Sequence, residues 1–113
     1  MADSFKQREK GEEFKYEMEQ EFQFKAESRR NRLLGEWLAE RFGMLSAETE
    51  TYTKEVIVSD LEEPGVDDVV RKVMKDIEDR GSAITEDEVR AKLDAFFSVA
   101  IEQLKGDFKP NSL

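Results

Sequence analysis

The spacing of apolar residues along this chain predicts helices. Between residues 22 and 42, apolar side chains recur every three or four positions, which gathers them on one side of a helix that Gly43 ends. They are Phe22, Ala26, Leu33, Leu34, Trp37, Leu38 and Phe42. A second segment, from about Ser46 to Glu63, has similar spacing, but residues 51–58 are rich in β-branched side chains, which also suit a strand. We favour a helix, because no neighbouring segment offers a hairpin partner.

Two more helices follow. Pro64 and Gly65 break the chain, and valines and an isoleucine at helical intervals then mark a helix from about residue 66 to residue 80. Thr85 and Glu88 have the spacing of a capping box, in which each side chain bonds the other's backbone amide, and a broad apolar face continues to residue 104 before Gly106. Short connections between four amphipathic helices predict an all-α fold, a small four-helix bundle over residues 20–106.

Residues 1–19 differ from the rest because their large apolar residues are isolated among charges. We expect this segment, the arm, to be mobile in the free protein and to fold against a partner. Phe5, Phe14 and Tyr16 favour that hypothesis over an idle tail, because a segment that only stays hydrated does not need them. Gly11 destabilises a helix by about 1 kcal/mol relative to Ala, which does not forbid a helix in the bound arm. Residues 107–113 are expected to fray.

The composition of the chain excludes several classes of function. A chain of 113 residues suits one domain, and its net charge of −9 disfavours binding to nucleic acid or anionic lipid. Without cysteine or histidine it lacks the usual zinc ligands and the commonest general base, so we expect no catalytic residues, no metal and no cofactor. No apolar run is long enough to insert into a membrane, and no secretory signal opens the chain, which predicts a cytoplasmic protein.

Two motifs resemble ligand sites. Residues 60–71 imitate a calcium loop, but Arg71 stands where a bidentate carboxylate is needed, so we interpret them as a turn. Arg29, Arg30 and Arg32 form the one basic cluster, a candidate anion site. The alternative is a solvated helix face on which Arg32 pairs with Glu36 one turn away. Trp37 lies within the apolar stripe, which favours a place in the core.

The segments FKA at residues 24–26, RRN at 29–31, LLG at 33–35 and Trp37 resemble the signature of a known family. It is the zeta subunit family, ATPase inhibitor proteins of the F-type ATP synthase in alphaproteobacteria. The resemblance covers essentially the whole chain, including the arm and the run DDVVRKV at residues 67–73. Gly11 and Phe22 depart from it, since they replace Ala and Leu respectively.

The resemblance implies a protein inhibitor. Its arm would become helical in a catalytic interface between the alpha and beta subunits, near the gamma rotor, and block rotation in the hydrolytic direction. The protein would be peripheral on the membrane-bound synthase, held through the catalytic head. The arm residues expected to bind the partner are Phe5, Arg8, Glu9, Glu13, Phe14, Lys15 and Tyr16. The rival hypothesis is a small bundle that senses an anion or a nucleotide through the three arginines.

Overall fold

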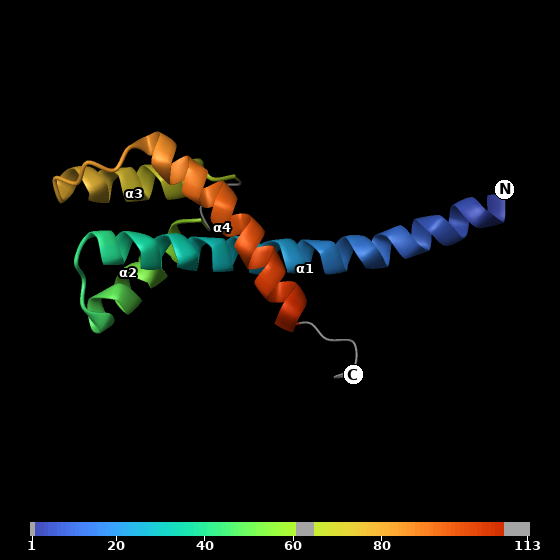
Figure 1. Cartoon of the computed structure of the whole chain (residues 1–113). Helices are drawn as coiled ribbons and strands as arrows, with labels where there is room; N and C mark the ends of the chain where they lie inside the picture. Colours follow the sequence, from blue (N-terminus) through green and yellow to red (C-terminus); the bar gives the residue numbers. More distant parts are fainter. Residues whose placement is uncertain (1, 61–64, 108–113) are drawn as a thin grey trace.

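The computed structural model describes the backbone of residues 2–60 and 65–107, with side chains for residues 20–60 and 65–106. Its four helices are α1 (Ala2–Arg41), α2 (Ser46–Ser59), α3 (Asp67–Asp79) and α4 (Glu86–Asp107) (Figure 1). The described residues contain no strand, and residues 51–58 are helical. The predicted all-α, four-helix architecture is confirmed.

Helix α1 spans the length of the molecule. Its 40 residues measure about 60 Å at 1.5 Å per residue, which matches the longest molecular dimension of 61 Å. Helix α1 packs chiefly against α2 and α4. Its C-terminal half lies among the other helices, whereas its N-terminal half projects away from them (Figure 1). The arm is therefore an extension of α1 outside the bundle.

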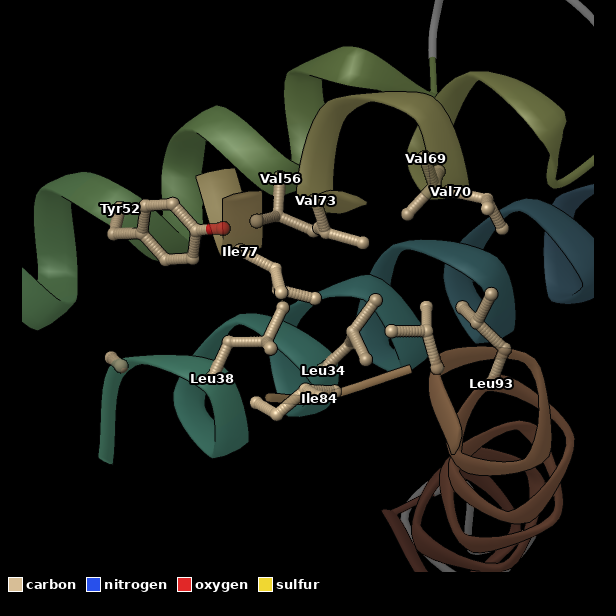
Figure 2. Packing of buried hydrophobic residues seen from close by; sticks show 12 residues of the cluster. Leu34, Leu38, Tyr52, Val56, Val69, Val70, Val73, Ile77, Ile84 and Leu93 are labelled. Atoms are coloured by element: carbon tan, nitrogen blue, oxygen red, sulfur yellow. The ribbon is translucent and has the colours of Figure 1, made fainter. Parts of the chain in front are cut away.

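One apolar core joins all four helices (Figure 2). Side chains from facing helices meet there at the spacings that the sequence predicted. The most buried members include Leu34 and Leu38 on α1, Val56 on α2, Val69, Val73 and Ile77 on α3, and Val89 and Leu93 on α4. Trp37 and Phe42 are partly buried against this cluster, so Trp37 belongs to its edge.

The helix ends agree with the sequence in part. Gly43 and Gly81 have φ angles of 72° and 65°, the left-handed conformation that glycine adopts readily, and they follow α1 and α3. The capping box is present: the amide of Glu88 donates to Thr85 Oγ1 at 3.2 Å, and the amide of Thr85 donates to Glu88 Oε1 at 3.5 Å.

Other boundaries differ. Helix α2 ends at Ser59 instead of near Glu63, and residues 61–64 lie outside the described residues, as do residues 108–113 of the predicted frayed tail. Helix α4 continues through Gly106 to Asp107, because a glycine near a helix end costs little. Helix α1 begins at Ala2, so the arm has the helical form expected of it on a partner. Its mobility in the free protein stays a prediction.

Candidate functional site: the helical arm and its root

The arm is a rod that leaves the bundle near residue 22. Going from the N-terminal end of the described side chains, Phe22 is half-buried and Ala26 is the first fully buried residue of α1. Residues 2–19 themselves span about 27 Å at 1.5 Å per residue. All seven predicted partner-binding residues lie on this helix, and their side chains are outside the described ones. The backbone thus places the arm outside the bundle.

A buried ion pair holds the part of α1 that enters the bundle, residues 26–35, which we call the root of the arm. Arg30 Nη2 lies 3.5 Å from Asp60 Oδ2, and the two side chains are only 8% and 12% exposed. Arg30 Nε also donates to Asn31 Oδ1 at 3.1 Å. The guanidinium carbon is 5.7 Å from the ring centroid of Phe97. These contacts tie α1 to the C-terminal end of α2 and to α4.

Burying the Arg30–Asp60 pair costs free energy, because removal from water disfavours both charges. Burial lowers the pKa of Arg30, although the carboxylate of Asp60 opposes the shift. Burial raises the pKa of Asp60, opposed by the nearby amide of Asn31 and by Arg30. That amide is close enough to act on Asp60, but its Nδ2 makes no hydrogen bond of good geometry. Each charge therefore depends on the other for compensation.

The structure gives the three candidate anion-binding arginines different surroundings. Arg30 is inside the bundle with Asp60. Arg32 is exposed and its Nε lies 3.5 Å from Glu36 Oε1, which is the pairing that the solvated-face alternative predicted. Arg29, which precedes both in the sequence, is half-buried. Because one guanidinium faces the interior and another faces solvent, the cluster does not converge on one ligand.

The acids of the calcium-like loop that the structure describes have protein partners. Asp60 faces Arg30, and Asp68 Oδ1 accepts from Arg71 Nη2 at 2.9 Å. Across the residues that the structure describes, no group of three or more metal-ligating side chains could hold an ion. Within the same residues, no helix combines the length and apolar character that crossing a membrane requires.

A close approach of two helices also fixes the root. A Cβ atom on Gly35 would lie 3.0 Å from Thr53 Cα and 3.3 Å from Thr53 Oγ1, so α1 and α2 touch through the absent side chain. Sequence reasoning did not find this contact or the Arg30–Asp60 pair. The sequence signal for the Gly35–Thr53 contact was a single glycine inside a strongly helical segment. The Arg30–Asp60 pair joins residues thirty positions apart, which periodicity does not reveal.

Comparisons with known proteins agree with this architecture. A family model described as ATPase inhibitor subunit zeta matches residues 1–103. One similar solved structure, described as a solution NMR structure, has 44% sequence identity and a TM-score of 0.67, over 76% of this chain and 98% of that chain. A comparison with curated proteins gives no match. Because the family model includes the arm, its root and nearly all of the bundle, the chain belongs to the ATPase inhibitor subunit zeta family.

Proposed function

We propose that this protein inhibits ATP hydrolysis by the F-type ATP synthase by inserting its arm between alpha and beta subunits near gamma. Membership of an ATPase inhibitor family supports the target. The observation that carries the mechanism is the unbroken course of α1 from the core to Ala2, which makes the arm a helical rod beyond the bundle (Figure 1). A rod of this kind suits a groove between subunits.

Continuity with the bundle favours such insertion. Ordering a free segment costs on the order of 1–2 kcal/mol per residue. An arm that extends an existing helix avoids the unfavourable nucleation step, so less of the contact energy is lost to ordering. The large side chains Phe5, Phe14 and Tyr16 are the proposed anchors. Arg8, Glu9, Glu13 and Lys15 would fix the register through charge complementarity.

The bundle would act as a stop. Its core and the Arg30–Asp60 pair hold the root of α1, so an inserted arm could not slide farther without unpacking the bundle. The gamma subunit would meet an obstacle fixed on the catalytic head, and the protein itself would supply no catalytic group. It would act in the cytoplasm at the membrane-bound enzyme. The rival sensing function has less support, because Arg30 is already paired.

The experiment compares the full chain with a variant lacking residues 1–19, using ATP hydrolysis by the purified cognate synthase head. We expect the deletion to abolish inhibition and to leave the thermal unfolding transition of the bundle nearly unchanged, because the core lies between residues 34 and 93. Retained inhibition would refute insertion of the arm. Loss of the transition together with inhibition would refute the separation of arm and bundle.

A substitution in the full chain sharpens the test. The double change Phe5→Ala/Phe14→Ala should weaken inhibition, because it removes two proposed anchors without shortening the arm. Val58→Ala is the matched control, since Val58 is an exposed apolar residue on α2. Equal effects of the two variants would refute a specific role of Phe5 and Phe14 as anchors.

A further inference from the structure

A second surface lies on the bundle where α4 passes over α1. We call it the crossing patch and define it by five residues: Trp37 and Arg41 on α1, and Lys92, Phe96 and Val99 on α4. The guanidinium carbon of Arg41 is 5.5 Å from the Trp37 ring centroid. Lys92 Nζ is 5.3 Å from the same centroid and 5.6 Å from that of Phe96. Two cations therefore share one tryptophan.

The charges of the crossing patch are not neutralised by the protein. Most lysines and arginines of the described residues have a carboxylate within 4 Å, as Lys72 and Arg90 do. In that same part of the chain, Arg41 and Lys92 face aromatic rings and have no such carboxylate. The same holds for Arg80, which stacks on the ring of Phe42 at 4.9 Å, so what distinguishes the patch is that two such cations meet on one tryptophan. Residues 22–43 carry five basic and three acidic side chains, so the patch adjoins a positively charged stretch.

Apolar surface accompanies these charges. Lys92, Phe96 and Val99 follow one another by four and three positions, which places them on one face of α4. Val99 is 43% exposed, and Trp37 and Phe96 are each partly exposed. Tryptophan and arginine are the side chains most enriched among residues that dominate binding energy. Cation–π stabilisation of the monomer explains the stacking, but it does not require an exposed valine or the absence of carboxylates.

We propose that the crossing patch is a second docking surface, for an acidic segment of the same synthase head that the arm engages. The proposal rests on the proposed function for the identity of the partner. Charge complementarity argues for carboxylates on that segment, opposite Arg41 and Lys92, with an apolar residue against Val99. Position argues for joint use, because Trp37 lies about 27 Å along α1 from residue 19, where the arm joins the rest of the helix. Two contacts at that separation would reinforce each other through effective concentration.

Charge reversal in the full chain tests this docking surface. The double variant Arg41→Glu/Lys92→Glu changes one exposed and one half-buried cation and keeps Trp37, so the core is retained. Lys75→Glu/Lys105→Glu is the matched control, with the same change in net charge at exposed positions on α3 and α4 outside the patch. Binding to the purified head is measured as association and dissociation rates at several salt concentrations, with ATPase inhibition and thermal unfolding recorded for each variant.

We expect the patch variant to bind the head about tenfold more weakly, mainly through slower association and a shallower salt dependence, while the control changes less than about twofold. Equal binding by the two variants overturns the crossing patch; if arm deletion still abolishes inhibition, the proposed function stands. Failure of the wild-type chain to bind the head refutes both. Self-association of the wild type that the patch variant abolishes, seen by sedimentation, would also overturn the proposal, because the surface would then serve a second copy.

Discussion

Arg30 and Asp60 should contribute to stability as a coupled pair, so that removing one changes the effect of removing the other. At 3.5 Å and an effective dielectric constant near 20, the two charges attract each other by about 5 kcal/mol. Desolvation of both groups offsets most of this attraction. Removing one partner leaves the other charge buried without compensation, so we expect Arg30→Met to lower the free energy of unfolding by about 3 kcal/mol. In a domain of this size that corresponds to a decrease in Tm of roughly 15 °C.

The measurement is a double-mutant cycle. Urea unfolding is followed by circular dichroism at 222 nm for the wild type, Arg30→Met, Asp60→Asn and the double variant. Asp60→Asn should cost only about 1 kcal/mol, because losing the charge that compensates Arg30 is partly offset by relief of the burial that raises the pKa of Asp60. The double variant should cost about 3 kcal/mol, which gives a coupling energy near 1 kcal/mol. Costs that add to within about 0.5 kcal/mol would refute the coupling.

The same variants predict a pH dependence. Burial raises the pKa of Asp60 above its ordinary value of 3.8, so the folded protein holds this proton more tightly than the unfolded chain does. The contribution of Asp60 to stability therefore falls as pH rises from 3.8 through the folded pKa. Subtracting the stability profile of Asp60→Asn from that of the wild type isolates this contribution. A difference that grows with pH in that window would contradict the assignment.

Three further changes test the packing. Gly35→Ala should cost about 1–2 kcal/mol despite a better helix propensity, because the new Cβ would meet Thr53 Cα at 3.0 Å; Gly106→Ala, in open space, should cost nothing in the same urea titration. Thr85→Ala removes the cap of α4 and should cost about 1 kcal/mol by thermal unfolding. Tyr52→Phe loses a 2.8 Å hydrogen bond to a carboxylate on α3 and should cost about 1 kcal/mol. Because burial raises the pKa of the Tyr52 phenol, wild-type stability should also fall faster than that of this variant above pH 10.

Periodicity was sufficient for the bundle because each helix buries one narrow stripe. Val69, Val73 and Ile77 are core residues at the intervals that predicted them, and the Thr85 cap lies where its spacing placed it. The segment at 51–58 was ambiguous because β-branched residues suit either structure. Tertiary packing decided it, since Tyr52 and Val56 are buried against the other helices.

Sequence was less informative about the polar root. The spacing of Arg32 and Glu36 is local, so their pairing could be predicted, whereas Arg30 meets Asp60 only after α2 has returned along α1. A cluster of arginines in sequence therefore looked like one site, although its members occupy different surroundings. Phe24 is a second example of a sequence pattern that does not reveal surroundings. Its side chain is 57% exposed although it belongs to the sequence signature.

The unbroken course of α1 links the arm to the rest of the molecule mechanically. Each residue of a helix turns the chain by about 100° and advances it 1.5 Å. The position and rotation of α1 at its root therefore determine the orientation of the arm. The contact of Gly35 with Thr53 sets how closely α1 approaches α2. The Arg30–Asp60 pair sets the rotation of α1 about its own axis. A target that meets both the arm and the crossing patch would thus meet two points on one continuous helix. Substitutions at the root should then change the direction in which the arm leaves the bundle. Such substitutions should alter inhibition although the substituted residues do not contact the target.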